Sequence, residues 1–236
     1  MAIAESCDTY FYDLGRRLTI DRMHEYLSPY GLGDRTGVDT TNERRGVLPS
    51  RQWKRDALNQ TWYPGETISA SIGQGYMLAT PMQLAMATSV LASKGQRRIP
   101  RLVREIDGEP VVAPELEPLQ ARPENWESVY RGMLDVVHDE GGTAKYLAKG
   151  IRYRMAGKTG TAQVIGIAQN AVYKEEEVDE RHRHHGLFIA FAPAEAPTIA
   201  VAIIVENGGG SSAASPIARK VIDTWLFGET DYEDPA

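Results

Sequence analysis

The sequence predicts an α+β fold in which helices cover both faces of a mostly antiparallel sheet. Leu187–Ala192 and Ile199–Val205 are apolar on both faces, a pattern that is typical of strands buried on both sides. Only Pro193–Pro197 separates them, and so short a connection favours antiparallel pairing. Segments with helical periodicity elsewhere in the chain would supply the two covering layers.

The composition of the 236-residue chain is that of an ordinary globular protein, with 42% hydrophobic and 25% charged residues. Its formal net charge of −6 opposes non-specific binding to nucleic acid, which requires lysine and arginine to neutralise phosphates. The longest apolar run, Thr198–Val205, is far shorter than the ~18 residues of a membrane-spanning helix. Met1–Glu5 lacks the basic and apolar regions of a signal peptide, so none is expected there.

Helical signals dominate the N-terminal part of the chain. Two short helices are expected over residues 6–18 and 19–27, and residues 29–68 are expected to be irregular because glycine and proline recur there. A strong helix is predicted to follow Thr80, which can cap it, and Gln83 would complete a capping box.

The C-terminal part of the chain predicts the strands and the helices that cover them. A turn at Asp107-Gly108 indicates a hairpin, and Ser215-Pro216 is typical of a helix start. The predicted elements are a hairpin over residues 99–112, a helix over 125–138, a strand over 158–164 and a closing helix over 215–226. The third strand of the sheet would therefore precede the two apolar ones.

The motif G-K-T-G-T at residues 157–161 is the sharpest local signal. It is not a phosphate-binding loop, because that motif needs a glycine at the place of Arg152. It matches the K-T-G strand motif of the serine penicillin-recognising enzymes, although a bare K-T-G occurs often by chance. Residues 6–8, S-C-D, begin 152 residues before Lys158 and loosely match the S-x-N motif that accompanies it; helix capping is the alternative role of these residues.

Ordered sequence blocks are more specific than any one motif. The blocks are SCDTYFY, WYPG, SIGQGYMLATPMQLA, GKTGTAQV, HGLFIAFAP and IVENGGG, in this order between Ala2 and Phe227. Together they resemble the transpeptidase domain of class B penicillin-binding proteins, most closely the cell-elongation enzymes of Gram-negative bacteria. The resemblance implies the penicillin-binding transpeptidase / serine β-lactamase-like fold, with a partial transpeptidase domain over residues 1–227 and an acidic tail over 228–236.

The family's first motif, S-x-x-K, supplies the nucleophilic serine and is absent from the chain. No serine is followed by lysine three residues later, and Ser50 and Lys54 miss this spacing by one residue. In the family that motif precedes the block that contains Ser6, so the resemblance implies a nucleophile upstream of Met1 and a fold that is incomplete at its N-terminus. We expect the chain to be inactive alone, and to aggregate because upstream elements would normally cover its apolar faces.

The resemblance assigns the proton-transfer roles to Ser6 and Lys158. A serine hydroxyl is a weak nucleophile and needs a nearby base. Lys158 would hold positive charge beside Ser6, ease proton transfer and attract the substrate carboxylate, and Ser6 would relay a proton towards the nitrogen of the leaving D-alanine. A solvated lysine at a strand edge is the alternative interpretation of Lys158.

Four further residues would bind the substrate, as the resemblance implies: Asp8, Thr159, Gly160 and Thr161. The hydroxyls of Thr159 and Thr161 would meet the terminal carboxylate, and the Thr161 N–H would form half of an oxyanion hole. Gly160 would let the acyl chain lie along the strand edge like an added strand. Asp8 stands where the family has asparagine, and an acid cannot donate a hydrogen bond unless it is protonated.

No metal or cofactor is expected. His182, His184 and His185 follow an acidic stretch and could bind zinc, but a mobile charged loop is the favoured interpretation. Cys7 is expected to be a buried structural thiol, although it could bind a metal with partners from elsewhere. Residues 207–212 could form an anion cradle, and a flexible connection is favoured.

The expected function is that of a serine-type peptidoglycan D,D-transpeptidase that cross-links stem peptides during cell elongation and is acylated by β-lactams. The resemblance implies as partners the stem peptide, β-lactam antibiotics, a SEDS-type glycan polymerase and elongation-complex proteins, but no nucleic acid. It implies the periplasmic face of the bacterial inner membrane, through an upstream anchor. Two alternatives stay open: a β-lactamase or β-lactam sensor of the same fold, distinguished by how fast the acyl group is released, and a non-catalytic module that binds a muropeptide or a protein.

Overall fold

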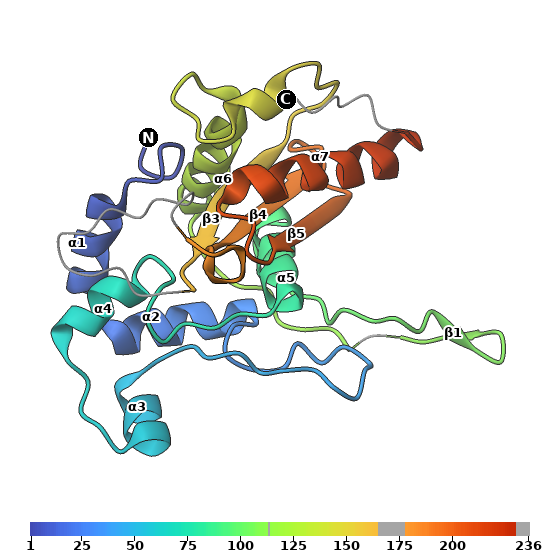
Figure 1. Cartoon of the computed structure of the whole chain (residues 1–236). Coiled ribbons are helices and arrows are strands. Elements are labelled where there is room, and N and C mark those ends of the chain that lie inside the picture. The colour runs from blue at the N-terminus through green and yellow to red at the C-terminus, as the bar shows by residue number, and fades with distance from the viewer. Residues whose placement is uncertain (113, 165–177, 230–236) are drawn as a thin grey trace. The chain divides into compact units, whose positions relative to one another are not determined.

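The computed structural model describes residues 1–112, 114–164 and 178–229, which form two compact units. One unit combines Met1–Ser6 with the chain from Glu127 onward, and the other is Cys7–Trp126. Helices and antiparallel strands occur together in the chain (Figure 1), so the predicted α+β class is confirmed. Within the described ranges, no helix has the length and apolar character that crossing a bilayer requires.

The sheet of the first unit has, in the described residues, three antiparallel strands in the order β3-β4-β5. The strands are β3 (Ala156–Ala162), β4 (His185–Ala192) and β5 (Ile199–Val205). Lys158 lies opposite Ile189, and Ile189 lies opposite Ala202. The predicted strands and their antiparallel pairing are confirmed, with β3 starting slightly earlier than expected.

Helical residues pack against both faces of this sheet. In the described residues, the helices of the first unit are η2 (Lys145–Ala148), η4 (Glu180–His182), α7 (Ser211–Phe227) and α6 (Pro123–His138), of which the part from Glu127 belongs to this unit. Figure 1 shows α7 lying across β4 and β5, and its Ile222 shares a fully buried cluster with Phe188. Side chains alternate along a strand, so Phe191 points to the opposite face. There its ring centroid lies 6.2 Å from that of Tyr130 in α6.

Helix α7 begins at Ser211 rather than at the predicted Ser215-Pro216. The start is set by Gly210, whose extended backbone (φ −159°, ψ −177°) precedes the first turn. Pro216 therefore lies inside the helix, where it lacks the N–H that a helix interior normally uses. The proline was a misleading signal because its usual place is the first helical position.

The connection from β5 to α7 is tightly held, which corrects the expectation of a flexible connection there. The Asn207 side-chain amide donates to the carbonyl oxygens of Arg181 and Arg183, at 2.9 and 3.0 Å. A Cβ at Gly186 of β4 would lie 2.0 Å from the carbonyl oxygen of Gly210. Because glycine alone permits this approach, backbone packs directly on backbone at this point.

The first unit leaves apolar surface and a strand edge uncovered among the described residues. There, β5 pairs on one side only, with β4. Ile217, Val221 and Trp225 of α7 are 43%, 40% and 62% exposed, and their spacing of four residues places them on one face of the helix. An open strand edge and an apolar stripe are both sites of association.

We expect the isolated 236-residue chain to self-associate at micromolar concentration, as measured by light scattering after size-exclusion chromatography. Replacing Ile217 and Val221 by lysine should raise the monomer fraction, because it places charge on the apolar stripe. Thr224→Lys, at an exposed position of the same helix, is the matched control and should have little effect. A concentration-independent monomer that melts cooperatively would contradict the expectation.

The second unit is mainly helical. Its helices are α1 (Asp8–Leu18), α2 (Ile20–Leu27), η1 (Ser28–Tyr30), α3 (Arg51–Leu58), α4 (Pro64–Ala70) and α5 (Pro81–Ala92). The first two helices and α5 are confirmed, whereas α3 and α4 correct the expectation that residues 29–68 are irregular. The capping box of α5 is present, because Thr80 Oγ1 accepts from the Gln83 N–H at 3.1 Å and Gln83 Oε1 accepts from the Thr80 N–H at 2.9 Å.

Tertiary contacts explain why α3 and α4 are helical. Lys54 of α3 is 1% exposed, and its ammonium pairs with Glu66 of α4. The rings of Trp62, Tyr63 and Tyr76 surround the ammonium, with centroids 5.8, 5.1 and 5.4 Å away. Burial alone would lower the pKa of Lys54, but the hydrogen bond to Glu66 raises it above its usual value, so the lysine is charged.

The predicted hairpin is present but short. Its strands are β1 (Glu105–Ile106) and β2 (Glu109–Pro110). The turn residues Asp107 and Gly108 have φ angles of 52° and 83°, as a type I′ turn requires. The strands do not extend further because the N–H groups of Leu102 and Val103 donate to the Asp39 carboxylate instead, at 2.6 and 2.8 Å.

Candidate active site

The structure brings Ser6 and Lys158 together, although 152 residues separate them in the chain. The Lys158 ammonium donates a hydrogen bond to Ser6 Oγ at 2.8 Å, and both side chains are partly buried. Both residues belong to the same unit, Ser6 at the end of Met1–Ser6 and Lys158 in β3. An ammonium that donates to a hydroxyl stabilises negative charge developing on its oxygen, so this pair can move a proton.

The backbone of Ser6 is held in the left-handed region, with φ at 54°, which is unfavourable for a residue other than glycine. Helix α1 has Cys7 as its N-cap residue, without a side-chain capping bond. Helix capping is therefore the wrong interpretation of Ser6, whose hydroxyl meets Lys158 instead. Backbone strain of this kind is typical of functional sites.

A polar network extends from this pair along β3. The Lys158 ammonium also donates to the backbone oxygen and to Oγ1 of Thr159, at 2.9 and 3.2 Å. Thr159 Oγ1 lies 2.9 Å from Thr143 Oγ1. The Thr143 N–H donates to the Ala4 carbonyl oxygen at 3.2 Å, which ties down the segment that leads to Ser6. Thr143 was not predicted, because no local pattern in the sequence marks it.

Gly160 and Thr161 lie towards the C-terminal end of β3. Thr161 is exposed, and a Cβ at Gly160 would lie 3.2 Å from Leu187 Cβ, closer than most such contacts. In the described part of the chain, β3 pairs with β4 and with no other strand. An open edge is what an extended peptide needs in order to add to a sheet.

Asp8 belongs to the other unit, where it is exposed as the first residue of α1. A carboxylate in the first turn is stabilised by the positive end of the helix dipole. This interaction with the helix dipole is enough to explain an acidic residue at position 8, even if Asp8 does not bind substrate. The substrate-binding role of Asp8 stays a prediction.

The histidines near β4 are built into the fold. His182 is exposed, but His184 is 4% exposed and His185 is the first residue of β4. Nδ1 of His184 and of His185 accept hydrogen bonds from the N–H groups of Val164 and Asn207, at 3.2 and 2.9 Å. A mobile charged loop is therefore the wrong interpretation of His184 and His185. The acidic residues 175–177 that precede them lie outside the described residues.

The described part of the chain contains no group of three or more His, Cys, Asp or Glu residues that could hold a metal ion. Cys7 is exposed, which corrects the prediction of a buried thiol. Its position explains the difference, because the N-cap residue of α1 lies at the start of a helix whose first residues are exposed. A thiol at the surface contributes nothing to the core.

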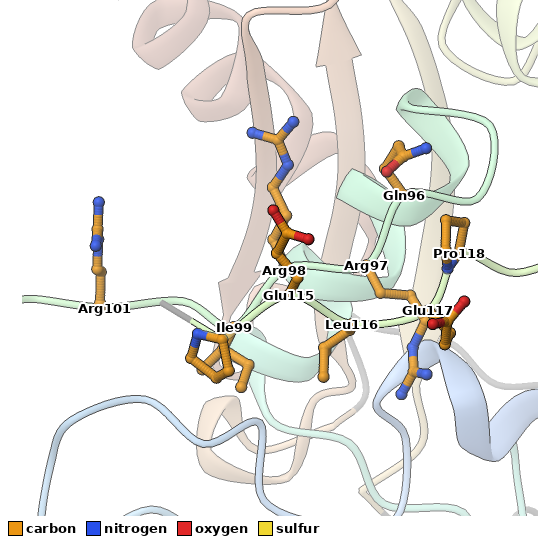
Figure 2. Close-up of a pocket in the computed structure, with 10 residues that line it drawn as sticks. Gln96, Arg97, Arg98, Ile99, Arg101, Glu115, Leu116, Glu117 and Pro118 are labelled. Atoms are coloured by element: carbon orange, nitrogen blue, oxygen red, sulfur yellow. The ribbon is translucent and has the colours of Figure 1, made fainter. Parts of the chain in front are cut away.

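A cavity of about 720 Å³ lies in the second unit between two segments, residues 96–101 and 114–118. Figure 2 shows arginine side chains on the first segment and glutamate side chains on the second. The charged lining residues are Arg97, Arg98, Arg101, Glu115 and Glu117. Opposite charge on the two segments favours their approach. The lining includes none of the predicted site residues, so this cavity is not the candidate active site.

Comparison with known protein families and sequences gives one consistent result. A family model described as the penicillin binding protein transpeptidase domain matches residues 1–223. The peptidoglycan D,D-transpeptidase MrdA of Acinetobacter baumannii is 42% identical over 234 residues, which cover 96% of this chain and 34% of the relative. The MrdA of Escherichia coli K12 is 39% identical over 241 residues, which cover 100% of this chain and 38% of the relative. The chain therefore spans about a third of the length of these relatives.

Solved structures agree with this result. The crystal structure of Pseudomonas aeruginosa PBP2 in complex with WCK 5153 has a TM-score of 0.84 and 46% identity, and the match covers 96% of this chain and 48% of that one. Helicobacter pylori PBP2 in complex with MreC has a TM-score of 0.76 and 34% identity, and the match covers 88% of this chain and 36% of that one. The resemblance stated from the sequence and the fold that it implies are both confirmed.

Proposed function

Because the chain belongs to the penicillin-binding protein transpeptidase family, we propose that it forms part of the active site of a peptidoglycan D,D-transpeptidase. The observation that supports the proposal is the hydrogen bond from the Lys158 ammonium to Ser6 Oγ, because these two residues resemble the family's third and second motifs. Residues 1–227 would form a partial transpeptidase domain that supplies proton transfer and substrate binding. A segment with the S-x-x-K motif would supply the nucleophile.

The reaction would pass through an acyl-enzyme. The serine of S-x-x-K attacks the carbonyl carbon that links the last two D-alanines of a stem peptide, and the terminal D-alanine leaves as an amine. The proton released by the serine reaches the departing nitrogen through Ser6, while the charge of Lys158 stabilises the transfer. An amine of a second stem peptide then attacks the ester, forms the cross-link and returns a proton to the serine by the same groups.

Substrate binding would use the exposed part of β3. The terminal carboxylate meets the hydroxyls of Thr159 and Thr161 and the charge of Lys158, and the peptide backbone pairs with the open edge of the strand at Gly160. The Thr161 N–H provides half of the oxyanion hole, and the N–H of the S-x-x-K serine provides the other half. Asp8 would accept a hydrogen bond from a substrate amide.

The proposed partners follow from the relatives. PBP2 of Helicobacter pylori has been solved with MreC, which supports a protein partner of this kind here, as expected for elongation-complex proteins. We also propose a SEDS-type glycan polymerase as a partner. β-Lactam antibiotics would acylate the serine of the S-x-x-K motif. The protein would act at the periplasmic face of the inner membrane. A second candidate is a non-catalytic module that binds a muropeptide, which binding without acylation would support.

Peptide mapping by mass spectrometry after incubation with benzylpenicillin tests the proposal. The chain alone is compared with the chain co-expressed with an S-x-x-K segment. We expect an adduct only in the second sample, on the serine of that segment. An adduct on a serine of this chain would show that the nucleophile has been misplaced. No adduct in either sample, together with muropeptide binding, would favour the non-catalytic module.

A further inference from the structure

Two histidine rings hold the two ends of β3. The Met155 N–H, one residue before the strand, donates to Nε2 of His138 at 3.1 Å. The Val164 N–H, two residues after the strand, donates to Nδ1 of His184 at 3.2 Å. His138 ends α6 and His184 precedes β4, so both rings are carried by elements of the same unit as β3.

Both hydrogen bonds require a neutral ring. A backbone N–H can only donate, so the ring nitrogen that faces it must carry a lone pair. Protonation would place a second N–H opposite the first and break the bond. His24 shows the opposite arrangement in the second unit, because its Nδ1 lies 3.0 Å from the carbonyl oxygen of Leu48, a contact in which the ring donates.

The surroundings of both rings favour the neutral form. Burial lowers the pKa of His138, and the charges of Arg154 and Lys145 lower it further, against a smaller opposing effect of Glu195. Burial also lowers the pKa of His184, and the neighbouring His185 adds to this effect. The folded protein therefore binds fewer protons at these rings than the unfolded chain does.

We propose that His138 and His184 are positioning residues that hold the strand carrying Lys158 only while their rings are neutral. The proposal rests on the proposed function for its catalytic consequence, since β3 also presents Thr159, Gly160 and Thr161. The sign of the pH dependence follows from the lowered pKa values. The stabilisation that depends on the two bonds is fully present above pH ~6.5, the ordinary pKa of histidine, and is lost as the pH falls towards the lowered pKa of each ring.

The first test is to determine the tautomers of both wild-type rings by NMR of the ¹⁵N-labelled chain. If the chain does not fold alone, it is co-expressed with the S-x-x-K segment. We expect the proton on Nδ1 of His138 and on Nε2 of His184 at pH 7.5, because the other nitrogen of each ring accepts. The opposite tautomer, or a protonated ring at that pH, would overturn the proposal. This measurement depends on neither a variant nor an enzymatic activity.

Two substitutions keep the acceptor but remove the titration. In His138→Gln the side-chain oxygen can take the place of Nε2, and in His184→Asn it can take the place of Nδ1. We expect the amide protection factors of Met155 and Val164 to fall in the wild type from pH 7.5 to 5.5, by at most about tenfold per pH unit for each ring. They should stay level in the double variant. His182→Asn, at an exposed ring, is the matched control and should behave like the wild type. Equal loss of protection in the double variant and the wild type would overturn the proposal.

The rate of benzylpenicillin acylation gives the second readout, in the chain co-expressed with the S-x-x-K segment. It should decline below pH ~6.5 in the wild type more steeply than in the double variant. Parallel pH profiles would overturn the catalytic consequence of the proposal. Complete absence of acylation in every sample would contradict the proposed function instead, while tautomers and protection factors would still decide whether the histidines hold the strand.

Discussion

Lys158→Ala is expected to lower the rate of β-lactam acylation by about 10²- to 10⁴-fold in the chain co-expressed with the S-x-x-K segment. The ammonium contacts Ser6 Oγ, the Thr159 backbone oxygen and Thr159 Oγ1, so its removal leaves the relay without charge and without its central donor. Lys158→Arg should restore little of the rate, because a planar guanidinium cannot reproduce three contacts made by a compact ammonium. The measurement is the second-order rate constant with a fluorescent penicillin.

Lys149→Ala removes an exposed lysine of the same unit and should leave the rate unchanged. Ser6→Ala should lower the acylation rate as well. The double variant Ser6→Ala/Lys158→Ala should be only slightly slower than Lys158→Ala alone, because the effects of residues that transfer one proton together are not additive. Unchanged acylation in Lys158→Ala, with an unchanged thermal melt, would contradict the proposed role of this residue.

Asp223→Ala is expected to lower the free energy of unfolding by about 3–5 kcal/mol. Asp223 and Arg219 of α7 are both 2% exposed and form an ion pair at 2.8 Å. Asp223 also accepts from the Tyr153 hydroxyl at 2.7 Å, while Arg219 donates to the Leu147 carbonyl oxygen at 2.6 Å. Removing the carboxylate would leave a buried guanidinium without its counter-charge and a partly buried hydroxyl without this acceptor.

Urea unfolding measures this loss. Asp179→Ala removes the same residue type from an exposed pair with Arg181, 64% and 76% exposed, and should change the free energy of unfolding by at most about 1 kcal/mol. Replacing Arg219 and Asp223 together by methionine and leucine should recover part of the loss, because no charge is then buried alone. A loss in Asp223→Ala no larger than in Asp179→Ala would show that the buried network does not stabilise the unit.

Elements with strong local signals were predictable. Thr80, Pro81 and Gln83 predict the capping box of α5 from the sequence, and the structure contains its two hydrogen bonds. The apolar strands β4 and β5 were predictable for a similar reason, since their composition and their short connection leave few alternatives. Local chemistry and tertiary structure agree in these elements.

Elements that depend on distant contacts were not predictable. Helices α3 and α4 have only 8 and 7 residues, and α4 contains Gly65, so neither is long enough to be stable from its local sequence alone. They are stabilised by the pairing of Lys54 with Glu66, which no local pattern reveals. Thr143 entered the candidate site for the same reason, because its place beside Thr159 is a product of the fold.

The central pair of the candidate site was predictable, but its geometry was not. The family motifs pointed to Ser6 and Lys158, and the structure places their side chains 2.8 Å apart. The left-handed backbone of Ser6 could not be predicted, because a serine at that position of the sequence is typical of an ordinary helix start.

The pairing of Ser6 with Lys158 also constrains the order in which the chain can fold. Closing a loop of 152 residues costs a flexible chain about 4 kcal/mol in conformational entropy. Contacts between residues so far apart in the sequence form slowly during folding. During synthesis Met1–Ser6 leaves the ribosome well before β3, and Ser6 cannot meet Lys158 until β3 has emerged. The unit Cys7–Trp126 can fold before β3 is synthesised, and most of the loop between Ser6 and Lys158 is then folded rather than flexible. The relay is thus assembled late, and a nascent chain interrupted before β3 has no Lys158 to pair with Ser6.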